Sequence, residues 1–496
     1  MDKVVFFRPK ANERRRIIVT PLQLISIAGT LEKSGFSCRI IDADLDKDYK
    51  EKIVAECSNA VCFALTAMTG YQIKNGLEVS RLVKEKFPKL PVIWGGWHPS
   101  IAFEETIKNE NIDFVVRGQG EHTFLELVKA IKKGGGFSKI NGIVLKQNGK
   151  TIVTDWREFE DINTFPPLAY HLIDVEKYIK ERGGPERTIE YRSSQGCPHN
   201  CTFCAESRMS KRRWSALRAE RVVLELEQLV KKYNIEKIVF FENNFFLDLN
   251  RAKAIFRGLA ERNIRVKMEN LNATVRSVLR FDDELLSLMR QAGCTNILLG
   301  VESGSQKILD LTHKSLKVEE VIEAKKKLSK YNIMPYISLI VGFPFEEVKI
   351  GEELEKTFLL IEKLQAIDKN NFYFINLYTS YPGTELYQQC IEKGMLKEKS
   401  LEDWAATDLT TVSNPWLEES YGPLLETLNN YVLPYLTHKS KEDWENFSKN
   451  IVLKKALSLA HAALSTAAEY RFRQRFFSFP LEFWLFKSFG KMQGAK

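Results

Sequence analysis

The sequence contains little cysteine, and its cysteines are unevenly placed. Eight occur in 496 residues, and five of them stand singly among apolar neighbours: Cys38, Cys57, Cys62, Cys294 and Cys390. Isolated cysteines in apolar surroundings are typical of buried free thiols rather than of a disulfide framework. The composition therefore excludes a disulfide-rich secreted protein and indicates a reducing compartment.

The sequence also lacks the long apolar runs of a membrane protein. No stretch of about 18 apolar residues is available to span a bilayer. Its first segment, MDKVVFFRPKANERRR, places a short apolar run before basic residues, which is the reverse of the order in a secretory signal. We therefore expect a cytoplasmic protein. The net charge of +9 is modest for this length and does not by itself indicate a nucleic-acid partner.

Two series of alternating strand and helix patterns fill most of the chain. From Val4 to about Lys133, short β-rich runs alternate with amphipathic stretches, which predicts a Rossmann-like, doubly wound parallel sheet covered on both faces. The second series has six strand candidates: TIEYRSS, KIVFFE, IRVKME, NILLGVE, YISLIVGF and FYFINLY. Six β-α units predict a partial (β/α)6 barrel, similar to a TIM barrel, with its chemistry at the carboxyl ends of the strands.

The segments between and after these series mark the domain boundaries. We predict a Rossmann-like domain over residues 1–140, a hairpin and linker over 141–186, a barrel over 187–400 and a mainly helical region over 401–496. The hairpin is expected to turn at Asn148-Gly149. Pro166-Pro167 and Gly183-Gly184-Pro185 are typical of a linker.

The other three cysteines are clustered directly after the first strand of the barrel. The segment GCPHNCTFC, residues 196–204, holds Cys197, Cys201 and Cys204. A structural zinc ion normally needs a fourth ligand, and His199 lies too close in sequence to these cysteines to be a good one. Three thiolates suit a 4Fe-4S cluster in which one iron is left open. The spacing therefore predicts an iron-sulfur centre with a free coordination position.

With this CxxxCxxC loop, and with Phe203 before its last cysteine, the chain resembles the radical S-adenosylmethionine (SAM) enzymes over about residues 190–390. The resemblance implies that the three cysteines bind the cluster and that SAM is cleaved reductively to a 5'-deoxyadenosyl radical. It assigns SAM contacts to three strand ends: Glu242 and Asn243, Glu302 and Ser303, and Gly342 and Pro344. Many relatives have two acidic residues in place of Glu242 and Asn243. Any one of these residues could simply end a strand or begin a helix. Their order along the barrel favours the family.

The N-terminal domain is similar to the cobalamin-binding domain that precedes the radical module in one large subgroup. The segments FALTAMTG, VIWGGWHPS and VVRGQGEHTFLEL carry this similarity. It implies that Thr66 and Thr69 flank the corrin and its tail. It also implies that Gly95, Gly96, His98 and Pro99 line the tail pocket, and that Gly118 and Glu121 close it.

One departure from the cobalamin mutases concerns the lower face of cobalt. No histidine precedes His98, and the loop RPKANERRR lacks the DxHxxG pattern of those enzymes. We therefore predict that cobalamin binds without a histidine lower ligand, with Met68 or Tyr71 near that face.

On this resemblance we expect a cobalamin-dependent radical SAM enzyme that methylates an unactivated carbon. One SAM would methylate Co(I), and a second would be cleaved so that a substrate radical takes the methyl group. The alternatives are a cyclase-type radical SAM enzyme, a methylthiotransferase-like enzyme and a non-catalytic cobalamin sensor. Methylthiotransferases use three N-terminal cysteines, whereas Cys38, Cys57 and Cys62 are better explained as core thiols. We expect a small, hydrophobic substrate and an external electron donor of the flavodoxin or ferredoxin type.

Two basic segments leave a choice of partners open. The C-terminal segment from residue 468 is rich in aromatic and basic residues, including Lys487, Lys491 and Lys496. It could lie at a membrane interface or pack back on the barrel, and we favour the second. The run ESRMSKRRWSALRAER has six cations: Arg208, Lys211, Arg212, Arg213, Arg218 and Arg221. No recognised RNA-binding domain accompanies it, so we expect a solvated helix start and no nucleic-acid partner.

Overall fold

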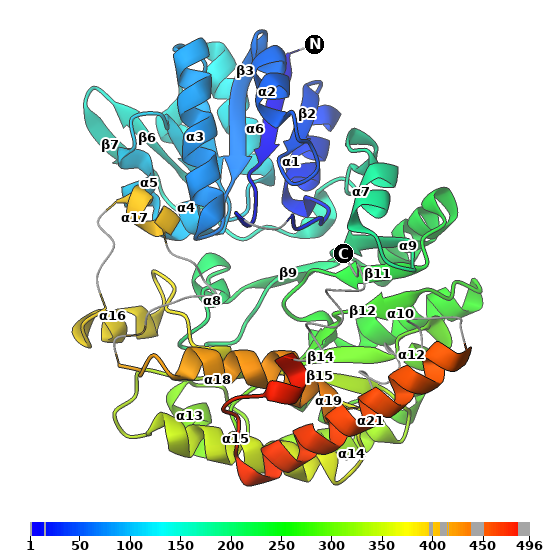
Figure 1. Cartoon of the computed structure of the whole chain (residues 1–496). Helices are drawn as coiled ribbons and strands as arrows, with labels where there is room; N and C mark the ends of the chain where they lie inside the picture. The colour runs from blue at the N-terminus through cyan, green and yellow to red at the C-terminus, as the bar shows by residue number, and fades with distance from the viewer. Residues whose placement is uncertain are drawn as a thin grey trace. The chain divides into compact units, whose positions relative to one another are not determined.

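The computed structural model describes residues 2–13, 16–395, 400–406, 414, 416–437 and 451–484 (Figure 1). The chain divides into two compact units. The first comprises Met1–Phe245, Arg257–Lys267 and Ser380–Val412, and the second comprises Phe246–Phe256, Met268–Thr379 and Ser413–Lys496. Each unit is therefore built from segments that are distant in the sequence.

The N-terminal part of the first unit is a seven-stranded sheet in the order β2-β1-β3-β4-β5-β6-β7. Its parallel strands are β1 (Lys3–Arg8), β2 (Ser37–Asp42), β3 (Ala60–Thr66), β4 (Val92–Gly95) and β5 (Phe114–Val116). The predicted hairpin, β6 (Ile143–Gln147) and β7 (Lys150–Val153), continues the sheet in antiparallel fashion. Asn148 and Gly149 both have positive φ, as a tight hairpin turn requires.

Helices cover both faces of this sheet (Figure 1), and an apolar core lies on each face. Val5 and Phe7 pack with α2 (Tyr49–Cys57) and α3 (Tyr71–Lys86), whereas Val4 and Phe6 pack with α1 (Leu22–Lys33) and α6 (Glu121–Lys133). Successive side chains of a strand point to opposite faces, which explains this division. The short helices α4 (Trp97–Ile101), α5 (Phe103–Lys108) and η1 (Phe137–Lys139) fill the connections.

A segment from far along the chain completes the first unit. The helix α17 (Leu401–Ala406) packs on α3, and its Leu401 and Trp404 belong to one of the two cores. Before it, α16 (Glu385–Glu392) lies beside the cysteine loop, where Leu386 N donates to Thr202 O at 3.3 Å. No local pattern in the sequence predicts that α16 and α17 pack on the first unit.

All six predicted barrel strands are present. They are β8 (Thr188–Tyr191), β11 (Lys237–Phe240), β12 (Lys267–Glu269), β14 (Asn296–Glu302), β15 (Met334–Val341) and β16 (Phe372–Leu377). The first three form a sheet in the order β12-β11-β8, and β13 (Asn272–Ala273) joins the others in the parallel sheet β13-β14-β15-β16. The predicted fold class is confirmed: a doubly wound α/β domain, a partial (β/α)6 barrel and a mainly helical C-terminal region.

Helices connect the strands of the barrel, and further helices make up the described C-terminal region. Those of the barrel are α8 (Glu206–Met209), α9 (Ala219–Tyr233), η4 (Phe245–Leu247), α10 (Leu249–Glu261), α11 (Val275–Leu279), α12 (Asp283–Ala292), α13 (Gln306–Leu311), α14 (Val318–Ser329) and α15 (Ile350–Gln365). The C-terminal region has α18 (Tyr421–Thr427), η5 (Leu428–Val432), α19 (Leu433–Tyr435) and α21 (Ile451–Gln474). Within the described part of the chain, no helix is long and apolar enough to cross a membrane.

The C-terminal aromatic segment packs back on the second unit in part. Phe472 and Phe477 contact Phe358 of α15 with ring centroids 5.3 and 5.4 Å apart, and Arg475 pairs with Glu355 at 2.9 Å. Phe479, by contrast, is 72% exposed. Residues 485–496, which contain Lys487, Lys491 and Lys496, lie outside the described residues.

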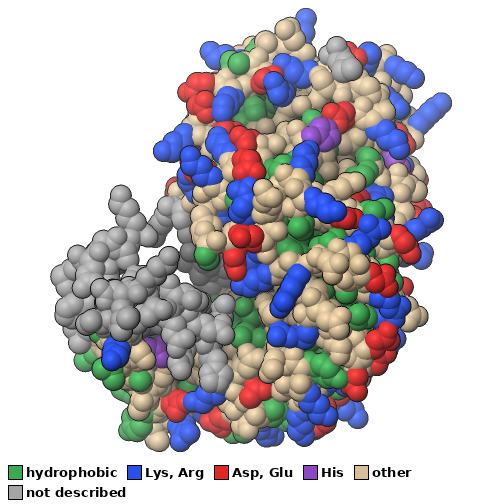
Figure 2. Space-filling view, turned by 90° about the vertical axis from the view of Figure 1, so that its right-hand side faces the viewer, with side chains coloured by type: hydrophobic (Ala, Val, Ile, Leu, Met, Phe, Trp, Pro, Cys, Tyr) green, Lys and Arg blue, Asp and Glu red, His purple; other side chains and the backbone are tan. Residues whose placement is uncertain are grey.

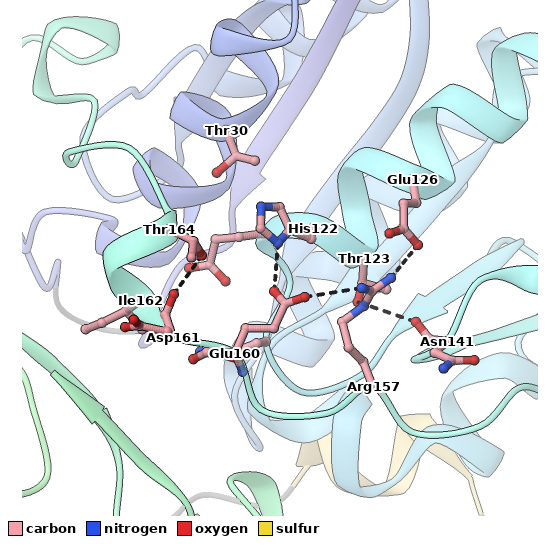
Figure 3. A network of polar contacts seen from close by, with 12 residues as sticks. Thr30, His122, Thr123, Glu126, Asn141, Arg157, Glu160, Asp161, Ile162 and Thr164 are labelled. Carbon is pink, nitrogen blue, oxygen red and sulfur yellow. Dashed lines mark hydrogen bonds and ion pairs between the residues drawn. The ribbon is translucent and has the colours of Figure 1, made fainter. Parts of the chain in front are cut away.

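The linker is more ordered than its proline and glycine content indicates. It contains η2 (Ile162–Thr164), η3 (Tyr170–Leu172) and α7 (Val175–Arg182), and a polar network ties it to α6 (Figure 3). Arg157 Nε donates to Thr123 Oγ1 at 2.7 Å, and the guanidinium of Arg157 pairs with Glu126 and Glu160. Glu160 Oε2 lies 2.8 Å from His122 Nδ1. The network fixes the start of α6, directly after the loop 118–121.

Candidate active site

The three clustered cysteines lie on the loop of a β-ribbon. The strands β9 (Ser194–Gly196) and β10 (Trp214–Ala216) pair antiparallel, and the connection between them carries Cys197, Cys201 and Cys204. All three cysteines are partly exposed and none forms a disulfide. Cys204 N donates to Cys201 O at 3.1 Å, which closes a turn. Gly196 has φ 82, and a Cβ there would collide with the Arg213 carbonyl, so glycine lets the two strands approach.

The donor set of this loop fits an iron-sulfur cluster. Among the described residues, no three His, Cys, Asp or Glu side chains converge closely enough to hold a single metal ion. Three thiolates that each bind a different iron of a cluster do not have to meet at one point. Burial raises the pKa of Cys204 to about 12, so this thiol keeps its proton until a metal displaces it.

Two ionisable side chains lie beside the cysteine loop. Glu206, at the start of α8, is buried, and burial raises its pKa to about 7 although the Asn243 side chain donates to it. Tyr381 comes from the segment YTSYPGTELY that follows the sixth strand. Burial, with a smaller effect of the Cys204 thiol, raises the pKa of Tyr381. In the sequence, only the aromatic and glycine pattern of this segment indicated that Tyr381 could belong to the site.

The end of β11 presents three consecutive polar side chains. The Glu242 carboxylate is buried and accepts from Ser193 Oγ at 2.9 Å and from the Ser194 hydroxyl. Asn243 is exposed, and Asn244, which sequence reasoning missed, is 1% exposed. Neither amide atom of Asn244 has a hydrogen-bond partner among the described residues. An unpaired buried amide is costly, and a bound polar ligand would remove that cost.

The residues predicted to bind cobalamin lie at the carboxyl ends of parallel strands in the first sheet. Thr66 ends β3, Gly95 ends β4 and Gly96, with φ 96, turns the chain into α4. A Cβ at Gly96 would collide with Thr66 Oγ1, so the two loops approach through backbone alone. Gly118, with φ 74, lies against the Trp156 ring. These glycines leave backbone accessible to a large planar ligand.

His98 is buried next to this sheet edge, as is Pro99 in the same short helix. His98 Nδ1 lies 3.0 Å from Thr69 Oγ1, and the Trp404 ring packs edge-on against His98 at 5.3 Å. Burial lowers the pKa of His98 to about 3, so its ring is neutral at pH 7. Its Nε2 has no partner among the described residues. Such an orphaned nitrogen fits a pocket that receives a polar ligand group. Met68, near the same loop, is 49% exposed.

The loop 118–121 is in direct contact with the strand that leads into the cysteines. Gln119 Nε2 donates to Gln195 Oε1 at 2.8 Å, and Gln195 Nε2 donates to Glu121 Oε1 at 3.4 Å. Glu121 also accepts from Ser26 Oγ at 2.7 Å. Nearby, α4 packs against α8. The first unit therefore joins the predicted cobalamin loops to the cysteine loop, an arrangement that the sequence did not reveal.

The second unit carries the other predicted SAM residues. Glu302 ends β14 with φ 74, which is rare for a residue with a side chain, and pairs with Lys314 at 2.7 Å. The next residue, Ser303, is fully buried, and its Oγ accepts from Ser305 N at 3.1 Å. An observed strained backbone of this kind is more frequent at functional sites than elsewhere.

The turn after β15 is held from two sides. Gly342, with φ 81, precedes the buried Pro344, and Gly342 O accepts from Trp416 Nε1 at 3.0 Å. Gly342 N donates to Glu353 Oε2 at 2.9 Å. Glu353 is almost fully buried, and burial raises its pKa to about 8. Sequence reasoning missed Glu353 because a glutamate on an amphipathic helix usually faces solvent.

Comparison with known proteins identifies the family. Residues 191–361 match the radical SAM superfamily, and residues 13–128 match the B12 binding domain. An uncharacterized methyltransferase of Pyrococcus horikoshii is 30% identical over 450 residues, which is 88% of this chain and 93% of the relative. The anaerobic magnesium-protoporphyrin IX monomethyl ester cyclase of Synechocystis sp. is 27% identical over 340 residues, 66% of this chain and 65% of the relative.

Solved structures show the same fold. The cobalamin-dependent SAM radical enzyme OxsB, with aqua-cobalamin and SAM bound, superposes with a TM-score of 0.74 at 18% identity. The match covers 99% of this chain and 75% of OxsB. The radical SAM methyltransferase TsrM from Kitasatospora setae gives a TM-score of 0.65 at 18% identity over 79% of this chain and 76% of TsrM.

The chain belongs to the radical SAM superfamily and carries a B12-binding domain. The expected family is therefore confirmed, and so are the expected cofactors: a 4Fe-4S cluster, SAM and cobalamin. The chain is a cobalamin-dependent radical SAM enzyme.

Proposed function

We propose that the chain transfers a methyl group to an unactivated carbon of a small molecule. The contact between the cysteine loop and the predicted cobalamin loop supports this most directly, with Gln119 and Gln195 joined at 2.8 Å. A methyl donor and a radical generator must both reach one substrate carbon, and this contact sets the distance between the segments that would hold them. The methyltransferase name of the relative matched over 93% of its length points the same way.

Within the first unit, the residues have separate tasks in this proposal. When bound, the cluster supplies an electron for SAM cleavage and cobalamin supplies the methyl group. Cys197, Cys201 and Cys204 would hold the cluster, with Phe203 packing beside it. Ser193 and Ser194 hold the Glu242 carboxylate in one orientation, so that this carboxylate and the Asn243 and Asn244 amides can receive the amino group of SAM. Thr66, Thr69, Gly95, Gly96 and His98 would form the cobalamin cradle, with Pro99, Gly118 and Glu121 at its border.

Within the second unit, buried partners orient the residues that would bind the nucleoside of SAM. Lys314 fixes the Glu302 carboxylate at 2.7 Å, toward a ribose hydroxyl in this proposal. Glu353 holds the Gly342 amide, so that the backbone from Gly342 to Pro344 keeps its shape for the adenine. Both contacts are made within the chain itself, so in this proposal they orient the two segments in advance, which lowers the entropic cost of binding.

A cyclase-type reaction is the second candidate. Three relatives with the cyclase name are 27% or 28% identical to this chain. The chain covers only 63% to 66% of their lengths, against 93% of the methyltransferase. Methyl transfer is therefore the better-supported reaction.

A methylthiotransferase-like auxiliary cluster is not supported. Cys38 and Cys62 lie in the core on one face of the first sheet, and Cys57 lies in the core on the other. Burial raises the pKa of Cys38 and of Cys57 to about 12. The prediction that these cysteines are core thiols is confirmed, and the two cores place Cys57 on the face of the sheet opposite to Cys38 and Cys62.

Product analysis tests the proposed reaction. The chain is reconstituted anaerobically with iron, sulfide and cobalamin, reduced with excess SAM, and its products are followed by mass spectrometry. Methyl transfer predicts both 5'-deoxyadenosine and S-adenosylhomocysteine, and Cys201→Ala should abolish the first. Deoxyadenosine without S-adenosylhomocysteine would favour the cyclase-type reaction. The absence of both products would refute the proposal.

We also propose that the exposed part of the C-terminal segment contacts a membrane surface. Phe479, Leu481 and Trp484 are 72%, 60% and 50% exposed. Arg471 and Arg475 are engaged with Glu482 and Glu355, so this contact would rest on rings rather than on cations. Changing the three exposed residues to serine should reduce co-sedimentation with phosphatidylglycerol vesicles. Equal sedimentation of variant and parent would refute the contact.

A further inference from the structure

The basic run after the cysteine loop separates into two groups. Arg221 pairs with Glu225 at 2.7 Å and donates to the Phe165 carbonyl at 2.9 Å, so it braces the linker. Arg218 lies near Asp161, whose pKa it helps to lower. The remaining cations are all exposed, and none forms an ion pair with a carboxylate among the described residues: Arg208, Lys211, Arg212 and Arg213. We call these four residues the basic turn.

The basic turn borders the cysteine loop. Arg212 Nε donates to Pro198 O at 3.5 Å, and the Arg213 carbonyl lies against Gly196, the residue before Cys197. His199 and Asn200, at the tip of the loop, are exposed. The outer side of the loop is therefore exposed at His199 and Asn200, and the basic turn borders the loop through Arg212 and Arg213.

The backbone of the basic turn is left-handed at two neighbouring residues. Lys211 and Arg212 have φ values of 48 and 59, a left-handed conformation that residues with side chains rarely adopt. The face in Figure 2 shows a different pattern, since Lys and Arg are interspersed there with Asp and Glu. Elsewhere cations are commonly paired, as Lys253 is with Asp282. Lys211 Nζ also lies 5.2 Å from the Trp156 ring centroid, a contact that leaves its charge uncompensated. Four cations without a carboxylate partner among the described residues create a local positive potential that mixed surfaces lack.

We propose that the basic turn, together with His199 and Asn200, is the docking surface for an acidic one-electron carrier protein. This inference rests on the proposed function. Reductive cleavage of SAM breaks its S–C5' bond and yields methionine and the 5'-deoxyadenosyl radical. The step consumes one electron, so the carrier is oxidised by one electron for each SAM cleaved. That electron has to enter through the protein surface near the cluster, and here the exposed part of the cysteine loop is flanked by cations. Arginine side chains bind carboxylates in bidentate fashion, and long-range attraction accelerates encounter.

The experiment compares two reductants on the full chain reconstituted with cluster and cobalamin. The test variant carries Arg208→Gln, Lys211→Gln, Arg212→Gln and Arg213→Gln. A matched control carries Lys86→Gln, Lys89→Gln, Lys129→Gln and Lys133→Gln, which removes as many exposed cations from other parts of the first unit. The initial rate of 5'-deoxyadenosine formation is measured with sub-saturating reduced flavodoxin and, separately, with titanium(III) citrate. Flavodoxin binding is measured by calorimetric titration.

The proposal predicts that the flavodoxin-driven rate and the flavodoxin affinity of the test variant fall about tenfold or more. The iron content and the titanium-driven rate of the test variant should stay within about twofold of the parent. The control variant should behave as the parent. Added salt should lower the flavodoxin-driven rate of the parent. Equal loss with both reductants would overturn the proposal, because the turn would then only shape the loop. Unchanged flavodoxin affinity of the test variant would also overturn the proposal. This result would include a basic turn that binds tRNA and not flavodoxin. If the parent makes no 5'-deoxyadenosine with titanium(III), the proposed function fails, while the flavodoxin titration still decides the docking surface.

Discussion

The contact between Gln119 and Gln195 gives the sharpest prediction about the site. Gln195→Leu keeps the approximate size of the side chain but removes the hydrogen bonds to Gln119 at 2.8 Å and to Glu121 at 3.4 Å. A neutral hydrogen bond contributes about 1 kcal/mol, and one to a carboxylate contributes more. The bond to Glu121 is long, and Glu121 keeps its bond from Ser26. We therefore expect a loss of about 1–2 kcal/mol.

This loss should appear as weaker cobalamin binding. The bond helps to hold the loop 118–121, together with the bond from Glu160 N to Gln119 Oε1 at 2.7 Å, so removing it lowers the fraction of chains with the loop ready to bind. A loss of about 1–2 kcal/mol corresponds to a dissociation constant raised by up to roughly 5- to 30-fold. The assay is an absorbance titration of cluster-containing protein with hydroxocobalamin. Gln147→Leu, at the exposed hairpin, is the matched control and should leave the affinity unchanged.

A double-mutant cycle isolates the pair. Gln119→Leu and Gln195→Leu together should cost less than the sum of the single changes by about 1 kcal/mol, because both remove the same bond. The reasoning is refuted if Gln195→Leu binds cobalamin within twofold of the parent, or if the two changes are fully additive.

Three further predictions concern single residues. Gly96→Ala should lower the free energy of unfolding by about 1–3 kcal/mol in thermal denaturation, because φ is positive and Thr66 blocks the new Cβ. Gly35→Ala, with positive φ but open space, should cost only about 1 kcal/mol, and equal losses would contradict the argument. The pKa of Glu353 is about 8 in the folded chain against 4.5 ordinarily, so the folded state binds this proton more tightly and stability falls as pH rises from 4.5 to 8. Denaturant titrations should show that the free energy of unfolding falls less over this pH range for Glu353→Gln than for the parent. An identical pH profile for the two proteins would be evidence against the buried acid. The EPR spectrum of the Co(II) form should lack nitrogen superhyperfine splitting, since the neutral His98 ring is buried against Trp404. Observed nitrogen splitting would show that a histidine or another nitrogen ligand binds cobalt.

Features that depend on neighbouring residues could be predicted from the sequence. The alternation of buried residues in β1 and the Asn148-Gly149 turn follow from local backbone geometry. The spacing of Cys197, Cys201 and Cys204 is likewise a local pattern. The ends of the barrel strands could be placed because each strand is a short apolar run that stops at glycine or a polar residue.

Features that depend on distant residues could not be predicted. Trp404 packs against His98, and Gln119 bonds to Gln195, across sequence separations that no periodic pattern spans. Asn244 and Glu353 escaped notice because a single polar residue carries no local signal of burial. The linker was underestimated for another reason: its proline and glycine residues outweighed helix signals such as the Asp174 side chain, which accepts from Lys177 N.

The central claim is that the chain holds one cluster at its three clustered cysteines and one cobalamin, and the metal content of the reconstituted protein tests it most directly. The account predicts about four irons and one cobalt per chain. Cys201→Ala should lose the iron and keep the cobalt, whereas Cys62→Ala, in the core, should keep both. About eight irons per chain, iron retained by Cys201→Ala, or a parent protein without cobalt would contradict the account.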